Sequence, residues 1–410
     1  PGGYPHKAQG FDVLKLLYPA KEFAVETLKE GQMPLWNPYN FSGNPLFASV
    51  QAGTLYPFTL LFLFAPFLPA WSLYILLQPI LAGVFTFLLL REFQLSRKSS
   101  LLGSLAYAFS SYMVVWIEYG NIGHTILWLP LALCLLYRNL KKPNLVQSIG
   151  LVLVLTLSLL AGYIQLAIYL FAYLFTFLIF YIVIIQKQNA VRNLFFHLPI
   201  FVSPILLSAV QLLPTLELFV NSTRSPYTVD AFLKLLIPKF HIVTAFVPDF
   251  FGNPATRNYW LTGTYIERVS YIGVVPLFFA IFGFLQKRTA LTWFFVGSLV
   301  VIFVLVFDTP LTRALYGLYM PPILSTGVPS RIMYLFCFAG SVLAAFGFNS
   351  FEKQKSTRML LGAIAIVGFI YLTLWLFVFI APHVLQEEWL ANLAVSKRNL
   401  ILPTGMIVLL

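Results

Sequence analysis

The chain has 410 residues, of which 59% are hydrophobic and only 10% are charged. Soluble domains carry roughly 25% charged residues, so this composition excludes a soluble protein. The net charge of +12 comes from Lys and Arg residues dispersed between apolar stretches, so we expect no nucleic-acid partner. Apolar stretches near the ~20 residues that a helix needs to cross a bilayer recur along the chain. We therefore predict an all-α, polytopic integral membrane protein in contact with the lipid bilayer.

Residues 1–70 are predicted to form a segment outside the membrane. The stretch DVLKLLYPAKEFAVETLKEG, residues 12–31, spaces its apolar residues as a helix does, with charged residues such as Lys21 between them. This pattern favours an interfacial amphipathic helix that is broken or bent near Pro19. Residues 55–69 are too short and too rich in proline for a confident span, and they predict a re-entrant or interfacial element. Because the chain starts without Met or a signal peptide, we expect a first transmembrane helix upstream of it.

A polar stretch, MPLWNPYNFSGNPLFASVQAGTLYP, interrupts the apolar pattern at residues 33–57. Its two Asn-Pro pairs predict turns, and its Trp and Tyr residues are typical of an interfacial aromatic belt. The same rings and amides can also frame a sugar or its acceptor. On that second interpretation, the candidate cavity walls are Trp36, Asn37, Tyr39 and Gln51.

Two transmembrane bundles are predicted, at residues 71–213 and 271–410, with a long outer loop at 214–270 between them. They give about ten or eleven helices in this fragment, and the chain end cuts the last one short. The predicted spans are about 71–90, 100–117, 124–140, 147–162, 164–185, 195–213, 271–286, 290–307, 331–349, 359–381 and a truncated one from about 399.

The distribution of charge predicts how these spans are oriented. Five short connectors on alternate ends of the spans hold 13 Lys and Arg residues but only 2 Glu, and the positive-inside rule assigns them to the cytoplasm. The other 12 Asp and Glu residues then lie mostly on the outer face. There, the segments 1–70, 214–270 and 308–330 can build a chamber, and the functional site is expected in it.

Neither transport nor redox or nucleotide chemistry is favoured by the residues of the spans. No Asp, Glu, Lys or Arg falls in the middle of a predicted span, whereas transporters usually bury such residues near the membrane midplane. Cys134 and Cys337 lie in apolar stretches and are interpreted as inert core thiols. No metal-binding or phosphate-loop motif is present, so we predict no cofactor, although a divalent cation such as Mg²⁺ stays possible.

An outer chamber with carboxylates, Arg and aromatic residues suits chemistry on a lipid-linked substrate. Asp12 would follow the missing first helix, and it is either the N-cap of the next helix or a base that takes the proton of an acceptor hydroxyl. Each outer Arg is either an interfacial anchor or a fork that binds phosphate. The phosphate-binding candidates are Arg224, Arg268 and Arg331, and Glu217 and His124 are further cavity candidates.

Two rival functions stay open on these residues. A flippase or exporter of a lipid-linked sugar would use similar aromatic and Arg residues but would need no base. A non-catalytic scaffold of a wall-assembly complex would depend on its partner surfaces, and its cavity would tolerate mutation.

Several blocks of the chain resemble the bacterial YfhO membrane protein family in the same order. They are Asp12 with Tyr18-Pro19, GQMPLWNPYNFSGNPLFASVQAGTLYP, GHTILWLPL, AGYIQLAIY, ELFVNSTRSP, VPDFFGNP, ERVSYIGVVPL and VPSRIMYLF. The most specific block is PLWNPY. One departure is Tyr163, where many relatives are expected to have His, whereas Gln165 is retained as a further cavity candidate.

That family in turn resembles the GT-C superfamily of membrane glycosyltransferases. The resemblance implies a polyprenyl-phosphate-linked sugar as donor and a cell-envelope polymer or lipid, such as lipoteichoic acid, as acceptor. It also implies a location in the bacterial plasma membrane with the active face outside the cytoplasm. In such enzymes a carboxylate in the first outer loop acts as the base, and Asp12 occupies that position here.

Overall fold

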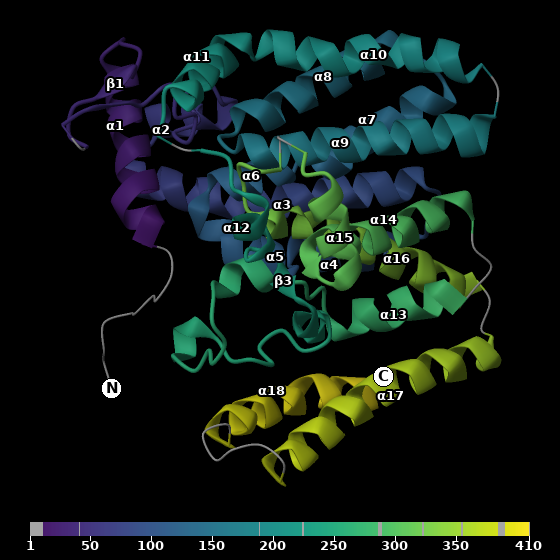
Figure 1. The fold of residues 1–410 in the computed structure, drawn as a ribbon. Helices are drawn as coiled ribbons and strands as arrows, with labels where there is room; N and C mark the ends of the chain where they lie inside the picture. Colours follow the sequence, from purple (N-terminus) through teal and green to yellow (C-terminus); the bar gives the residue numbers. More distant parts are fainter. Residues whose placement is uncertain are drawn as a thin grey trace.

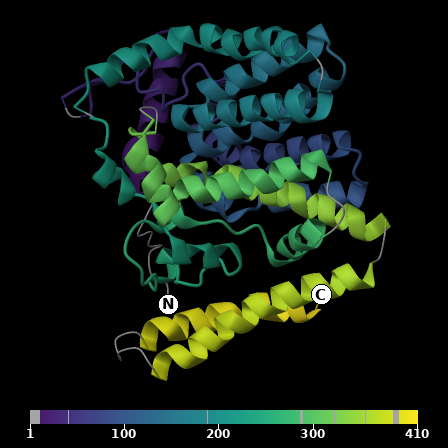
Figure 2. The ribbon, with the colours of Figure 1, turned by 45° about the vertical axis from the view of Figure 1, so that its right-hand side comes forward.

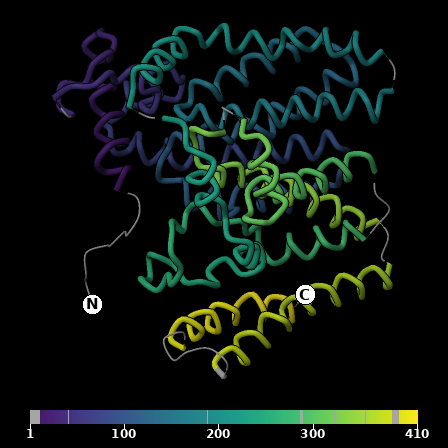
Figure 3. The backbone as a smooth tube through the Cα atoms, viewed as in Figure 1, coloured from purple at the N-terminus to yellow at the C-terminus, as the bar shows by residue number. Residues whose placement is uncertain are grey.

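The computed structural model describes residues 11–409, apart from 41, 188, 224, 286–288, 322–323, 354–355 and 384–389. The described residues form a bundle of helices with two short strand pairings, so the all-α prediction is confirmed. Most of the long helices run along one common direction, and one end of the bundle carries the longer non-helical segments (Figure 1). We call this the loop-rich end; the helix ends that flank the short basic connectors lie at the opposite end (Figure 3).

The N-terminal helix lies at the loop-rich end, across the direction of the long helices (Figure 1). It begins as a π-helical stretch, η1 (Val13–Leu17), and continues as α1 (Tyr18–Lys29). Pro19 lacks the N–H group that an α-helix would direct at the carbonyl of residue 15, which is why the irregular turn lies directly before it. The predicted bend near Pro19 therefore takes the form of a π-helical stretch.

The polar stretch after α1 forms a small antiparallel β-hairpin. Strand β1 (Trp36–Asn37) pairs with β2 (Asn44–Pro45), with Trp36 opposite Pro45. Residue Gly43 has a φ angle of +108°, and a Cβ atom there would lie 2.6 Å from the Trp36 ring. Only glycine therefore fits under the ring. The next residues form two short helices, η2 (Pro57–Leu60) and α2 (Leu61–Phe64).

The first bundle contains the helices that position most of the site. In chain order they are α3 (Phe67–Glu92), α4 (Arg97–Ala108), α5 (Ser111–Trp116), η3 (Ile117–Tyr119), α6 (Asn121–Ile126), α7 (Leu129–Lys141), α8 (Leu145–Leu160), α9 (Ile164–Phe180), η4 (Tyr181–Gln186), α10 (Ala190–Leu207) and α11 (Ala209–Val220). The predicted span at 124–140 is thus divided between α6 and α7, and α11 ends seven residues beyond the predicted 213.

The remaining elements alternate between the loop-rich end and the bundle. They are α12 (Val229–Leu233), β3 (Ile237–Pro238), η5 (Lys239–Ala245), η6 (Pro254–Thr256), η7 (Tyr265–Arg268), α13 (Val274–Leu285), α14 (Ala290–Val306), β4 (Phe307–Asp308), α15 (Pro310–Leu318), η8 (Pro329–Ile332), α16 (Met333–Lys353), α17 (Thr357–Ile380), η9 (Ala381–His383) and α18 (Leu390–Leu409). Strands β3 and β4 pair in parallel, which joins the two later outer segments.

Helix α16 forms the centre of the bundle and packs against α4, α13 and α14. Its contact with α13 depends on glycine, because a Cβ atom at Gly347 would lie 1.8 Å from the carbonyl oxygen of Phe279. Small residues let membrane helices approach this closely. Helices α17 and α18 form a separate layer on the far side of α13 (Figure 2).

The described residues include six helical segments that are long and apolar enough to cross a membrane. They are Phe67–Glu92, Arg97–Tyr119, Ile164–Gln186, Ala190–Leu207, Pro329–Lys353 and Thr357–Ile380. Four shorter apolar helices, α8, α11, α13 and α14, accompany them. Many of the large apolar side chains on the outward faces of these helices are exposed, as expected where a helix contacts lipid.

Lys21 lies differently from the pattern predicted for an amphipathic helix. Its side chain is buried, with only 4% of its surface exposed, and Nζ donates to the carbonyl of Ala52 at 2.8 Å and to Thr59 Oγ1 at 2.6 Å. The ammonium also lies over the rings of Phe62 and Tyr74, at 5.3 and 5.2 Å from their centroids. These contacts make burial of the charge tolerable and fix α1 to the loop that follows the hairpin.

Candidate functional site

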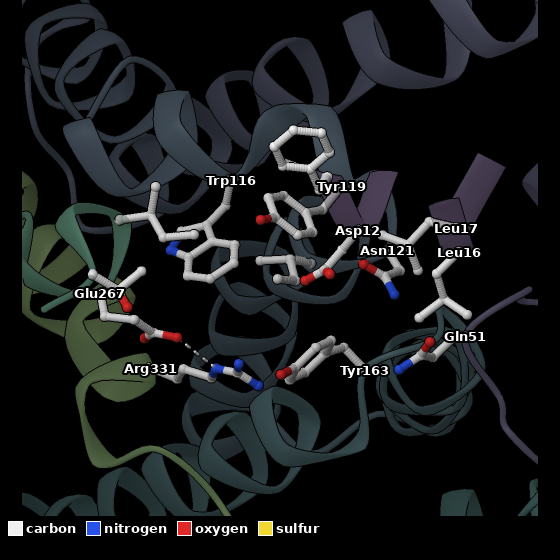
Figure 4. A pocket seen from close by; sticks show the side chains of 14 residues that line it. Asp12, Leu16, Leu17, Gln51, Trp116, Tyr119, Asn121, Tyr163, Glu267 and Arg331 are labelled. Atoms are coloured by element: carbon white, nitrogen blue, oxygen red, sulfur yellow. Dashed lines mark hydrogen bonds and ion pairs between the residues drawn. The ribbon is translucent and has the colours of Figure 1, made fainter. Parts of the chain in front are cut away.

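A cavity of about 450 Å³ opens at the loop-rich end of the bundle. It is built from segments far apart in the sequence, including the start of the N-terminal helix, the loop at residue 51, the η3–α6 region and η7 (Figure 4). Its polar and aromatic lining residues are Phe11, Asp12, Gln51, Trp116, Tyr119, Asn121, Tyr163, Thr264, Glu267 and Arg331.

Asp12 contributes an exposed carboxylate to this cavity. Its backbone is helical, with φ −60° and ψ −33°, and its side chain makes no capping hydrogen bond. The N-cap interpretation therefore has no hydrogen bond to support it among the described residues. The carboxylate is directed into the cavity beside Asn121 and Tyr119, on the other side of the hollow from Arg331 (Figure 4). It is thus free to contact a bound molecule.

Arg331 is held at the opposite wall by an ion pair with Glu267. Its Nε atom lies 3.2 Å from Glu267 Oε1, and the exposed fractions of the two side chains are 22% and 14%. Ser330 donates from Oγ to Glu267 Oε2 at 2.7 Å. The Arg331 backbone is fixed as well, because its carbonyl accepts a hydrogen bond from the hydroxyl of Tyr112. One edge of the guanidinium is therefore anchored, and it still faces the cavity (Figure 4).

Aromatic rings support the same guanidinium. Its central carbon lies 5.0 Å from the ring centroid of Tyr163 and 5.8 Å from that of Trp116. Cations near ring faces are stabilised by the ring quadrupole, and planar Arg stacks especially well. The Tyr that stands where His was expected therefore contributes a ring that holds Arg331.

The ionisation of Glu267 is poised near neutral pH. Burial raises the pKa of its carboxyl to about 7, and the hydrogen bond from Ser330 opposes this rise. When Glu267 is charged, it neutralises part of the Arg331 charge. When Glu267 is protonated, the positive charge of Arg331 is no longer neutralised, so the pair attracts an anion more strongly.

Two buried polar groups of the cavity wall have no hydrogen-bond partner within the described part of the chain. They are the indole Nε1 of Trp116, a donor, and the amide Oδ1 of Asn121, an acceptor. Trp116 is only 3% exposed and Asn121 only 5% exposed. Most buried polar groups in proteins are paired, so these two atoms are exceptions within the wall of the cavity.

Of the sequence-predicted site residues, the cavity brings together Asp12, Gln51 and Arg331. Gln165 lies in a neighbouring cavity, where its Nε2 donates to the hydroxyl of Tyr169 and the carbonyl of Val328. Glu217 is exposed on α11 and does not line either cavity. Arg224 lies outside the described residues.

The hairpin keeps three predicted wall residues away from the cavity. The side chains of Trp36 and Tyr39 are 54% and 84% exposed. Asn37 accepts a hydrogen bond from the backbone N–H of Tyr39, which closes a local turn. The structure therefore agrees with the first interpretation of this stretch, in which the Asn-Pro pairs form turns and the aromatic rings lie at the surface. It does not place Trp36, Asn37 or Tyr39 in the cavity wall.

His124 is fully buried and serves a hydrogen-bond chain behind the cavity. Trp128 Nε1 donates to the Tyr56 hydroxyl, which lies 3.0 Å from His124 Nδ1, and Nε2 lies 2.8 Å from the carbonyl of Tyr74. Because a carbonyl only accepts, Nε2 carries the proton and Nδ1 accepts from Tyr56. The imidazole is thus neutral and locks α3 to α6.

Arg268 points into its own loop. Its guanidinium lies 3.2 Å from His241 Nε2 and donates to the carbonyl of Thr262. It lines a separate hollow of only about 10 Å³. Although Arg268 is adjacent to Glu267 in sequence, the two side chains serve different sites.

Sequence reasoning did not single out Glu267, Trp116 or Asn121. Glu267 stands in the ERVSYIG block directly before Arg268, which was one of the predicted phosphate-binding residues. The block therefore indicated a functional segment, but it did not show which of the two charged neighbours lines the cavity. The partnership of Glu267 with Arg331 crosses 64 residues and depends on the packing of η7 against η8. In the described residues there is no group of three or more His, Cys, Asp or Glu that could hold a metal ion.

A second cavity of about 570 Å³ adjoins the first and shares Gln51, Tyr163 and Arg331 with it. It lies between α9 and α11, and its wall is mostly apolar, with Ile164, Ile168, Leu212, Leu216 and Phe219 among its lining residues. Arg331 therefore stands at the border between a polar cavity and an apolar one.

The fold and the cavities define a polytopic membrane protein with a polar site at one end of its bundle. The family model described as bacterial membrane protein YfhO matches residues 51–402, and the chain belongs to this family. Gln51, Glu267 and Arg331 fall within the matched range, whereas Asp12 precedes it. A comparison with curated proteins found no match.

Proposed function

We propose that this protein is a membrane glycosyltransferase that moves a sugar from a polyprenyl-phosphate donor to a cell-envelope acceptor. The observation that carries the proposal is the shared cavity of Asp12 and Arg331, a carboxylate and a cation on facing walls. The exposed amide of Gln51 in the same cavity adds a donor and an acceptor suited to sugar hydroxyls.

The proposed reaction is a single displacement at the anomeric carbon. Asp12 accepts the proton of an acceptor hydroxyl as its oxygen attacks that carbon. The bond between the anomeric carbon and the phosphate oxygen breaks, and the electron pair leaves with the polyprenyl phosphate. Arg331 stabilises the charge on the departing phosphate through its planar fork. Attack opposite the leaving group inverts the configuration of the sugar.

The charge distribution supports an active face outside the bacterial cytoplasm. The helix ends that flank the basic connectors lie at the end of the bundle opposite the loop-rich end (Figure 3). By the positive-inside rule, that end faces the cytoplasm, so the cavity faces outward. A lipid-linked donor with its head group at the outer surface could then reach the cavity from the bilayer.

A reconstituted system tests this function against transport of a lipid-linked sugar. The purified protein is placed in proteoliposomes with radiolabelled polyprenyl-phosphate hexoses and a crude preparation of envelope polymer. The proposal predicts free polyprenyl phosphate and labelled polymer in equal amounts. Movement of intact lipid-sugar across the bilayer, with no transfer product, would instead establish the transport function.

A further inference from the structure

Gln51 enters the polar cavity from a loop whose backbone is fixed on two sides. On one side, Lys21 Nζ donates to the carbonyl of Ala52 at 2.8 Å, which joins the loop to the helix that begins beside Asp12. On the other side runs the turn between α8 and α9, where a Cβ atom at Gly162 would lie 3.2 Å from the carbonyl oxygen of Gln51. Because Gly162 also has a φ angle of +108°, glycine is required for this close approach.

The residue before Gln51 has a strained backbone. Val50 has a φ angle of +60°, in the left-handed region that β-branched residues rarely adopt. Its side chain is buried, and its N–H donates to the carbonyl of Phe47 at 3.1 Å, so the surrounding contacts hold this conformation. Strain of this kind is retained mainly at functional sites. Here it sets the direction from which the Gln51 side chain leaves the loop.

The side chain of Gln51 is free, in contrast to its backbone. It is exposed, and its carboxamide makes no hydrogen bond to any of the residues that the structure describes. By contrast, the amides of Gln78, Gln165 and Gln211 each donate to a backbone carbonyl of a distant segment. A carboxamide is uncharged and offers both N–H donors and a carbonyl acceptor. The Gln51 amide can therefore bind a neutral, hydroxylated molecule.

The charged residues of the polar cavity leave the Gln51 end neutral. They are Asp12, Glu267 and Arg331. Gln51 lies at one end of the cavity and the ion pair of Glu267 with Arg331 at the other, with Asp12 between them (Figure 4). Because a phosphate is attracted to Arg331, the Gln51 end is left for the second reactant.

We infer that Gln51 binds hydroxyl groups of the acceptor and so places one of them at Asp12. The neutral amide favours an uncharged, polyhydroxylated part of the acceptor over a phosphate or carboxylate group. This inference rests on the proposed function, and it deepens that function by assigning the two ends of the cavity to the two substrates. The competing assignment is that Gln51 binds the sugar of the donor.

Gln51→Met distinguishes the two assignments. Met keeps the length of the side chain but removes the amide, and the wild-type amide has no partner among the described residues whose loss would disturb the fold. Gln32→Met is the matched control, because Gln32 is exposed in the same outer segment and lines neither the polar cavity nor the one between α9 and α11. The KM for envelope polymer is measured by sugar transfer in proteoliposomes. The affinity for a polyprenyl-phosphate hexose is measured without acceptor, by native mass spectrometry.

Gln51→Met should raise the KM for the polymer by about five- to tenfold, the effect of one lost hydrogen bond. It should leave the affinity for the polyprenyl-phosphate hexose within about twofold, and Gln32→Met should leave both quantities unchanged. An unchanged KM for the polymer, or a weaker affinity for the lipid-linked hexose, would overturn the inference while the enzyme stands. A wild-type protein that transfers no sugar would overturn the proposed function together with the inference.

Discussion

Arg331 and Glu267 meet at 3.2 Å across the wall of the polar cavity, although 64 residues separate them in the chain. The pair connects η7, just before α13, with η8 at the start of α16. It holds the guanidinium between two aromatic rings and facing Asp12 (Figure 4). A cation fixed in this way is preorganised for an anionic group, because little side-chain freedom is lost on binding.

Arg331→Lys tests the need for a planar fork. Lysine keeps the charge but cannot form two parallel hydrogen bonds to phosphate, so we expect transfer to fall by about 10²-fold. Arg268→Lys is the matched control, since Arg268 lies on the neighbouring loop and does not line the cavity. Rates are measured with a polyprenyl-phosphate sugar in detergent. If both variants lose activity equally, phosphate binding is not a specific role of Arg331.

Glu267→Gln should remove a step in the pH dependence of donor binding. Burial raises the pKa of Glu267 to about 7, so the carboxylate forms as the pH rises through 7 and then competes with the donor for Arg331. The wild type should therefore bind polyprenyl phosphate more weakly above pH 7 than below it. The Gln variant should bind equally well on both sides. A titration of affinity from pH 5.5 to 8.5, corrected for ionisation of the phosphate with a protein-free reference, tests this; an unchanged step in the variant would refute it.

Trp116→Phe removes the unpaired indole N–H and keeps a ring beside Arg331. If that N–H binds substrate, the affinity should fall by about five- to tenfold, the value of one hydrogen bond of roughly 1 kcal/mol. Trp71→Phe serves as the control because Trp71 does not line the polar cavity. Equal binding by the wild type and Trp116→Phe would show that the indole N–H is unused.

Lys21→Met should change how stability depends on pH. Burial lowers the pKa of Lys21 to about 7, from an ordinary value of 10.5. Between these values the unfolded chain binds more protons than the folded one, so the Lys21 contribution to the free energy of unfolding rises with pH from about 7 to about 10.5. Below pH 7 it is constant and unfavourable.

The difference in Tm between the wild type and Lys21→Met, measured in detergent from pH 6 to 10, should therefore shift in favour of the wild type as the pH rises. Lys29→Met is the control, because Lys29 is exposed on the same helix. A parallel response of the wild type and Lys21→Met would show that Lys21 titrates as in water.

Composition and the spacing of apolar stretches were sufficient to predict an all-α membrane bundle, because backbone groups in lipid must be paired within helices. They could not predict that the turn between η3 and α6 carries Asn121 into the cavity wall, or that Lys21 turns inward. Both depend on tertiary packing, which helical periodicity does not encode. Three of the predicted site residues, Asp12, Gln51 and Arg331, line one cavity, because all lie in segments at the loop-rich end of the bundle.

The most specific sequence block, PLWNPY, forms the exposed hairpin and not the cavity wall. Its Asn-Pro turns follow from local chemistry, but whether its rings face a cavity depends on contacts with distant segments. For the same reason, the sequence did not identify Glu267 as the ion-pair partner of Arg331. Adjacent residues Glu267 and Arg268 carry equal local signals, and only the packing of η7 on η8 distinguishes them.

The most direct test of the account is sugar transfer by Asp12→Asn. The amide has nearly the shape of the carboxylate but cannot accept the acceptor's proton, so we predict a loss of transfer of about 10²-fold or more. The variant should still bind polyprenyl phosphate with wild-type affinity, because Arg331 and the apolar cavities are unchanged. Transfer at the wild-type rate by Asp12→Asn would contradict the central claim that Asp12 is the catalytic base.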